Sequence, residues 1–338
     1  MSNTENKTEY KTALVYANDT FLGMIEKQME NHNIPISDYG KVCVVNAISA
    51  INDLLTTNGM NFSNKDLDTS TLTTALITAA TLQLNAKATN REIYFQLRNK
   101  KVKTANGDAW VKQLEWGIEG DGWDSLISRF GRGIQKVYPF WLVRSGDKYT
   151  PARHKGLETL PPEWEESGVG EVVRVVYPVV YTDGTIHYFT CEKDETLKNL
   201  YAHINNNIMN ETFGICKDRY KATPEETAQI AAKKKEVLDK AKELGWGALD
   251  DAEISKYISP SWTDYHSRES MIIRKMRNRI CKSIPKDFGS AYASDVYNRA
   301  SDEGYAAVID VVDAVDVTDK AELIGTGEEA QGTAKPNF

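Results

Sequence analysis

Four carboxylates close together in the sequence, Glu115, Glu119, Asp121 and Asp124, are the residues best suited to metal-assisted chemistry. Carboxylate oxygens are the ligands that Mg²⁺ prefers, and nucleases use such ions to activate water and stabilise the leaving group. The spacing of these four residues matches no metal-binding motif, and acidic residues near the start of a helix commonly act as caps. We therefore expect no metal or other cofactor, and a magnesium-dependent nuclease is retained as an alternative function.

Three glycines, Gly117, Gly120 and Gly122, lie among these carboxylates and precede a predicted helix. A glycine-rich turn before a helix can bind phosphate, but this segment has neither the dinucleotide-binding spacing nor the Lys-Ser/Thr pair of a Walker loop. The neighbouring carboxylates would also repel a phosphate. We interpret the segment as a strand-to-helix turn, with Asp121 as the N-cap and Gly131 as the C-terminal stop.

Basic and aromatic residues are interleaved between residues 87 and 144. Cations at this density suit a surface that follows nucleic-acid phosphates, while flat side chains contact bases. The predicted DNA contacts here are Lys87, Arg91, Tyr94, Arg98, Lys112, Trp123, Arg129, Arg132, Lys136 and Arg144. Trp110 is a further candidate for base contact. The alternative is a solvated charged face over an aromatic core.

A second basic segment runs from Met271 to Ile284, and no acidic residue lies between Met271 and Lys286. The helical spacing of Ile273, Met276, Ile280 and Ile284 predicts a buried stripe, which leaves the cations on other faces without partners in their own helix. We expect these cations to bind the DNA backbone. They are Arg274, Lys275, Arg277, Arg279 and Lys282.

The elements that must position these residues form a mixed α+β fold. Apolar residues recur at helical spacing in residues 22–29, 44–55, 72–80, 123–130, 194–208 and 269–284, and Asp194 is the predicted cap of the helix at 194–208. A capping box of Thr223 and Glu226, with Pro224 at the first helical position, predicts a further, highly charged helix that ends at Gly245. Alternating patterns predict antiparallel strands at 93–98, 110–116 and 140–143, and a hairpin at 172–191 that turns at Asp183-Gly184. Pro178 predicts an edge strand or a bulge. We expect these strands and hairpins, flanked by helices, to form a basic DNA-binding groove.

The charges are unevenly distributed along the chain. Residues 301–338 contain nine acidic residues and two lysines, whereas residues 1–300 contain 39 acidic and 39 basic residues. This pattern predicts a disordered N-terminus at 1–15, a single core at 16–300 with a charged helical insertion at 215–260, and a flexible acidic tail at 301–338.

The cysteines and the first residues bear on the cellular compartment. Cys43, Cys191, Cys216 and Cys281 form no zinc-binding pattern, and we expect buried thiols in a reducing cytoplasm. Residues 1–7 lack the basic and apolar regions of a secretion signal, so neither secretion nor membrane insertion is expected.

The second basic segment resembles the phage RecT/Redβ group of single-strand annealing recombinases. That family has a Trp after a Pro- or Ser-containing lead, a Met, a basic pair, an Arg pair and a final Leu-Pro. The matching residues are Pro260-Ser-Trp262, Met271, Arg274, Lys275, Met276, Arg279, Ile280 and Ile284-Pro285. Two positions depart from the pattern: Lys275 stands where the family favours Thr, and Asn278 replaces one of the paired arginines.

The segment 110–149 resembles the centre of the same family, where a Gln precedes Gly, an aromatic residue, a short amphipathic helix and a strand that ends in Asp and an aromatic residue. The matching residues are Gln113, Gly120, Gly122, Trp123, Leu126, Ile127, Arg129, Val143, Asp147 and Tyr149. The resemblance spans roughly residues 40–300 and rests on the order and spacing of its motifs.

This resemblance implies a DNA-binding protein that performs no covalent chemistry. It would anneal complementary single strands without ATP in phage-type recombination, as a ring or helical filament of many copies. The implied partners are single-stranded DNA, the annealed duplex, a phage exonuclease and a host single-strand binding protein, in the cytoplasm of the bacterial host. A non-catalytic oligomeric scaffold, whose acidic tail recruits a partner, is the remaining alternative.

Overall fold

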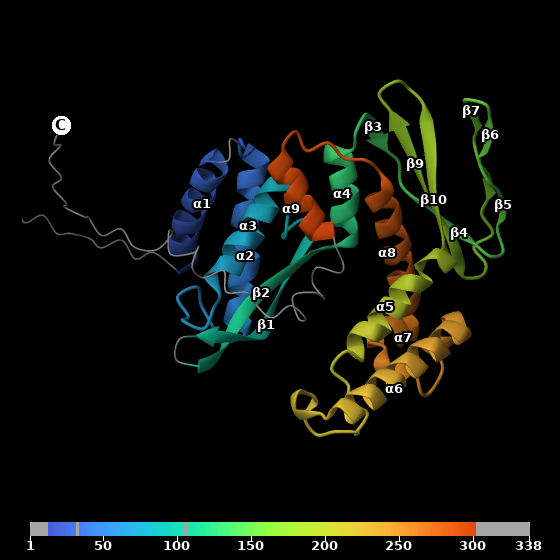
Figure 1. Cartoon of the computed structure of the whole chain (residues 1–338). Coiled ribbons are helices and arrows are strands. Elements are labelled where there is room, and N and C mark those ends of the chain that lie inside the picture. The colour runs from blue at the N-terminus through green and yellow to red at the C-terminus, as the bar shows by residue number, and fades with distance from the viewer. Residues whose placement is uncertain (1–12, 32–33, 105–106, 302–338) are drawn as a thin grey trace, which may run out of the picture.

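The computed structural model describes residues 13–31, 34–104 and 107–301, which form a mixed α+β fold as predicted (Figure 1). The predicted acidic tail lies outside the described residues, apart from Ser301. The predicted disordered segment 1–15 overlaps a helix that begins at Ala13. No helix in the described part of the chain combines the length and the apolar character needed to cross a membrane.

Three helices form one side of the molecule: α1 (Ala13–Asn31), α2 (Asp38–Thr57) and α3 (Thr69–Thr81). Side-chain oxygens of Ser37 and Asp68 cap α2 and α3 by accepting hydrogen bonds from backbone N–H groups. The apolar stripe of α2 is buried as its spacing predicts, with Ile48, Ile51 and Leu55 fully inaccessible.

A long antiparallel hairpin follows, formed by β1 (Ile93–Thr104) and β2 (Gly107–Ile118), in which Ile93 pairs with Ile118. This confirms the strand pair predicted from the alternating pattern. Backbone hydrogen bonds join Lys112 of β2 to Asp66 and Asp68, and they fix the hairpin to the connection before α3. The hairpin therefore shares the core of the N-terminal helices.

The helix α4 (Gly120–Phe130) begins directly after β2. Its N-cap is Glu119, not Asp121, which lies in the first turn. The predicted cap was wrong because the Glu119 N–H bonds the carbonyl of Glu92, so the chain enters the helix two residues earlier than the acidic pattern indicates. A Cβ at Gly122 would lie 2.1 Å from that carbonyl oxygen, which explains the glycine. The predicted stop at Gly131 is confirmed.

A second sheet contains β3 (Ile134–Val137), β4 (Trp141–Arg144), β9 (Val172–Tyr181) and β10 (Ile186–Glu192). The predicted hairpin β9–β10 is confirmed, but β9 is central and not an edge strand. The carbonyl of Pro178 accepts a hydrogen bond from the N–H of Tyr138, which lies in the connection between β3 and β4. In an antiparallel strand the N–H and C=O of one residue point to the same side, so the missing N–H of Pro178 is on the side where the neighbouring strand is interrupted. The proline is therefore tolerated in a central strand.

Residues 148–165 form two short antiparallel strand pairs. They are β5 (Lys148–Thr150) with β8 (Glu163–Glu165), and β6 (Arg153–Lys155) with β7 (Glu158–Leu160). Asp147 fixes the base of this ladder by accepting hydrogen bonds from the Arg144 N–H, the Trp164 indole, and the N–H and hydroxyl of Ser167. These bonds hold the pKa of Asp147 well below its usual range.

A helical region follows the second sheet. It contains η1 (Lys193–Thr196), α5 (Leu197–Asn207), η2 (Arg219–Lys221), α6 (Pro224–Leu244), η3 (Gly245–Leu249), η4 (Ser255–Tyr257) and α7 (Pro260–Thr263). The capping box of Thr223 and Glu226 is confirmed at the start of α6. The predicted insertion packs on α5, with Val237 and Ala241 in the main hydrophobic core. Asp194, the predicted cap of α5, lies in η1 and accepts the Trp246 indole N–H instead.

The last two helices are α8 (Tyr265–Ser283) and α9 (Ala291–Ser301). Figure 1 shows α9, which the periodicity did not reveal, between the N-terminal helices and α4. The buried face of α8 contains Ile272, Met276 and Ile280, whereas the predicted Ile273 is half-buried. Ile284 is buried as predicted. Of the four thiols, Cys43, Cys191 and Cys281 are buried as expected and Cys216 is half-buried.

Candidate nucleic-acid interface

The C-terminal ends of α4 and α8 lie side by side, although far apart in the sequence. Gly131 and Lys286 form an antiparallel backbone bridge. The Arg132 N–H donates to the Pro285 carbonyl at 2.9 Å, and the Asp287 N–H donates to the Phe130 carbonyl at 2.7 Å. We name the basic residues around this bridge, Arg132, Lys282 and Lys286, the junction cluster. Both predicted basic segments thus contribute to one surface.

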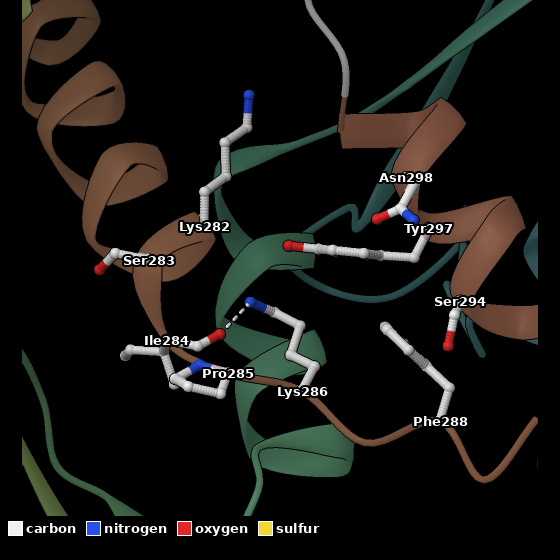
Figure 2. A pocket seen from close by; sticks show the side chains of 9 residues that line it. All are labelled: Lys282, Ser283, Ile284, Pro285, Lys286, Phe288, Ser294, Tyr297 and Asn298. Carbon is white, nitrogen blue, oxygen red and sulfur yellow. Dashed lines mark hydrogen bonds between the residues drawn. The ribbon is translucent and has the colours of Figure 1, made fainter. Parts of the chain in front are cut away.

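A cavity of about 220 Å³ lies beside the junction cluster, between the end of α8, the segment that follows it and α9 (Figure 2). Its lining contains cationic, hydroxyl, amide and apolar groups, and none of its residues is acidic. The lining residues are Lys282, Ser283, Ile284, Pro285, Lys286, Phe288, Ser294, Tyr297 and Asn298.

Lys286 caps the C-terminal end of α8 with its side chain. Its ammonium donates to the carbonyl oxygens of Cys281 and Ile284 at 2.5 and 2.8 Å, and it lies 5.1 Å from the centre of the Tyr297 ring. A cation at this helix end is favoured by the helix dipole. Burial nevertheless lowers the pKa of Lys286 to about 8 and raises that of Tyr297 to about 12.

Trp123, predicted to contact bases, is instead a core residue with 3% of its surface exposed. Its ring meets Tyr297 edge-on at 6.1 Å, and the Lys282 ammonium lies 5.1 Å from its centre. Trp123 faces the core because it lies on the same apolar stripe of α4 as Leu126 and Ile127. Trp123 therefore makes a cation–π contact with Lys282 from the core side.

Arg129, also predicted to contact DNA, is held by the buried carboxylate of Glu92. Glu92 is 6% exposed and accepts hydrogen bonds from the Asn85 N–H at 2.8 Å, the Ser125 hydroxyl at 2.5 Å and both terminal nitrogens of Arg129 at 2.8 and 3.1 Å. Arg129 also donates to the carbonyl of Gln83 at 2.6 Å. These bonds join the end of α3, the start of β1 and α4, so Arg129 has a structural role.

Arg277 was predicted to bind the DNA backbone, but it is buried in a second polar network with 13% of its side chain exposed. Its guanidinium donates to Asp121 at 3.0 Å, to Asp124 and to the Tyr177 hydroxyl at 2.9 Å, and it lies 4.3 Å from the centre of the Phe140 ring. Burial raises the pKa of Tyr177. The network joins α4, α8 and β9, and it leaves Arg277 unavailable to a ligand.

Six other predicted contacts lie in ion pairs of partial exposure. The pairs are Lys87–Asp53, Arg91–Glu119, Arg98–Glu115, Arg144–Glu269, Arg274–Glu119 and Arg279–Glu195, with N···O distances from 2.5 to 3.5 Å. Exposed pairs of this kind contribute ~0–1 kcal/mol to stability. A phosphate can therefore compete with the carboxylate for such a cation at low cost.

The remaining predicted residues differ in their exposure. Arg132 and Lys136 are exposed, and the Lys136 ammonium lies 4.3 Å from the centre of the Tyr138 ring. Lys112 and Lys275 are half-buried. Tyr94 is also half-buried because its ring covers Gly117, where a Cβ would lie 2.5 Å from the hydroxyl. Trp110 on β2 is 65% exposed and stays available for base contact.

The carboxylates considered for metal binding are engaged by arginines. Glu115 pairs with Arg98, Glu119 with Arg91 and Arg274, and both Asp121 and Asp124 with Arg277. Within the described ranges, no three His, Cys, Asp or Glu residues are arranged to hold a metal ion.

Sequence reasoning missed six residues of the cavity, and Lys286, Tyr297 and Asn298 are among them. A signal for Lys286 was present, because a basic residue just after a Pro-terminated helix is well placed to bind its last carbonyls. Tyr297 and Asn298 belong to α9, whose stripe of Ala293 and Val296 is short and weakly apolar.

Compared with protein-family models, curated proteins and solved structures, the chain matches none of them.

Proposed function

We propose that this protein binds single-stranded DNA and anneals complementary strands without ATP, as an oligomer in phage-type recombination. The observation that carries the proposal is the backbone bridge between Gly131 and Lys286. It collects cations from both predicted basic segments on one surface, next to a cavity with no acidic lining. Nucleic-acid phosphates are the ligands that such a surface attracts most strongly.

Binding would draw on two kinds of cation. Arg132 of the junction cluster and Lys136 of β3 are exposed. The arginines of the exposed ion pairs, such as Arg91 and Arg279, exchange carboxylate for phosphate when DNA arrives. Since each phosphate contact releases counterions, the affinity falls steeply as salt increases. The expected basic groove would extend from the junction along these pairs.

Aromatic contact with bases would come from Trp110, which projects from β2 with most of its surface exposed. Stacking of a base on such a ring contributes ~1–3 kcal/mol and depends little on sequence. This suits a protein that must bind any single strand before it finds the complement. The expected partners are a phage exonuclease and a host single-strand binding protein in the bacterial cytoplasm.

An annealing assay tests the proposal. A labelled strand of about 30 nucleotides and its labelled complement are added in sequence, without ATP, and pairing is followed by energy transfer. We expect annealing faster than that of the free strands, at low salt. Neither binding nor acceleration would contradict the proposal. The same samples with Mg²⁺ are examined on a denaturing gel, since DNA fragments would support the nuclease.

A further inference from the structure

The half-buried Lys286 ammonium has no negative partner among the described residues. Its bonds to the Cys281 and Ile284 carbonyls use two of its three donors. No carboxylate of the described residues pairs with it: the nearby Asp287 accepts the Gly289 N–H, and Asp295 pairs with Arg299. Buried charges in proteins are normally paired, so this cation lacks a counter-ion that the cavity beside it has room to hold.

Two further donors open into the same cavity. Among the described residues, neither the Tyr297 hydroxyl nor the Asn298 side-chain amide has a hydrogen-bond partner. Figure 2 shows the Tyr297 ring extending from α9 toward the end of α8, with Lys286 beside it and Lys282 above. The cavity of about 220 Å³ would hold roughly seven waters at ~30 Å³ each, which is ample for a tetrahedral anion. Ammonium, phenol and amide groups are all phosphate donors.

We propose that this cavity is a phosphate-binding subsite, in which Lys286 and the Tyr297 hydroxyl hold one backbone phosphate of single-stranded DNA. This deepens the proposed function and rests on it for the identity of the ligand. Lys282 and Arg132 extend the positive surface beyond the cavity. The phosphate completes the coordination of an ammonium that α8 already orients.

The proposal gives DNA binding a defined pH dependence. A bound phosphate stabilises the charged amine, so the pKa of Lys286 must rise from about 8 on binding. Among the described residues, the Cys281 thiol of α8 acts on the charge of Lys286, and the Tyr297 ring of α9 lies against its ammonium. Burial raises the pKa of the Cys281 thiol, and Tyr297 titrates at about 12, so both stay protonated between pH 7 and 9.

The test measures the pKa of Lys286 directly, in the full chain, by NMR of lysine labelled at Cε. The signal is assigned by its loss in Lys286→Arg. One arm adds a 30-nucleotide oligo-dT, another adds inorganic phosphate, and binding of the oligonucleotide is verified by anisotropy in the same samples. We expect saturating oligonucleotide to raise the pKa by about one unit, which corresponds to tenfold tighter binding of the protonated form.

Two variants separate phosphate binding from the closing of α8. Lys286→Arg keeps a charge that does not titrate in this range, so it should lose the change in affinity between pH 7 and 9. Tyr297→Phe, which removes only the hydroxyl, should weaken binding about threefold at pH 7. If Lys286 only binds the last carbonyl groups of α8, neither result is expected.

The outcomes distinguish the subsite from the proposed function. If the oligonucleotide binds and the pKa of Lys286 does not move, the subsite is wrong and DNA binding stands. If the oligonucleotide does not bind, the proposed function is wrong, and the samples with inorganic phosphate alone show whether the cavity binds an anion. A raised pKa with phosphate then supports an anion site, and an unchanged pKa overturns it.

Discussion

Gly131 and Lys286 face each other across a backbone bridge that joins the end of α4 to the end of α8. Each helix belongs to one of the two basic segments of the sequence. Without this bridge, Arg132 and Lys282 would belong to separate surfaces. Cations around it that reach the surface are expected to act in binding, and cations held in buried polar networks are expected to act in folding.

Glu92→Gln should lower the free energy of unfolding by about 3 kcal/mol, because it leaves the guanidinium of Arg129 enclosed without its charge partner. Urea denaturation measures the change. The control is Glu165→Gln, which breaks the exposed pair with Lys148 and should cost less than ~1 kcal/mol. Equal effects of the two substitutions would contradict the structural role of the Glu92–Arg129 pair.

Trp123→Ala should mainly lower stability, whereas Trp110→Ala should mainly weaken DNA binding. Loss of the buried Trp123 should cost about 3–5 kcal/mol of stability. Loss of the exposed Trp110 should change stability little, but weaken DNA binding by ~1–3 kcal/mol for the base that it stacks. Thermal unfolding and anisotropy measure the two quantities, and a Trp110 variant with unchanged DNA affinity would remove that ring from the binding surface.

The contrast between these two tryptophans shows how far the sequence predicts the site. Alternation along β2 places Trp110 and Trp116 on the same face of the strand, but only tertiary packing decides that one is exposed and the other half-buried. For Trp123, the helical stripe with Leu126 and Ile127 indicates a core position, and the basic-aromatic pattern outweighed that signal.

The basic helix shows a second limit. Ile272 and Ile273 are adjacent, so the pattern alone could not decide which one faces the core. The structure buries Ile272. Met276, Ile280 and Ile284 are buried as predicted, so the difference is confined to this one position of the stripe. Arg277 is held by Tyr177 of β9 and by Asp121 and Asp124 of α4, and such contacts between distant segments have no signature in the local sequence.

Stability should fall as the pH rises above about 8.5, the usual pKa of a thiol in an unfolded chain. Burial raises the pKa of Cys43 to about 12 in the folded protein. The unfolded chain therefore loses the thiol proton first, and stability that is fully present below pH 8.5 is lost as the pH rises toward 12. Each such thiol contributes a slope of about −1.4 kcal/mol per pH unit.

Cys43→Ala should reduce the loss of stability by that slope between pH 9 and 11. Urea denaturation at each pH measures it. Below pH 8 the curves of the variant and the parent should run parallel, separated only by the packing cost of the substitution. Curves that stay parallel up to pH 11 would show that the Cys43 thiol ionises equally in both states.

Arg277→Lys should destabilise the fold by about 2 kcal/mol, because an ammonium cannot reproduce the bonds of the guanidinium to Asp121, Asp124 and Tyr177. Under conditions where the variant is folded, its affinity for single-stranded DNA should equal that of the parent. Denaturation and anisotropy together check both statements. A stable variant with weakened DNA binding would place Arg277 in the binding surface after all.

The most direct test of the central claim is the salt dependence of single-stranded DNA affinity after removal of two junction cations. The double variant Arg132→Gln/Lys282→Met is compared with a matched control on the helical region, Lys221→Met/Lys235→Met, in which both lysines are exposed. If both junction cations contact phosphates, the slope of log affinity against log salt should become shallower by about 1.4, at ~0.7 per contact, and the control should match the parent. An unchanged slope and affinity in the junction variant would contradict the claim that the α4–α8 junction is a nucleic-acid interface.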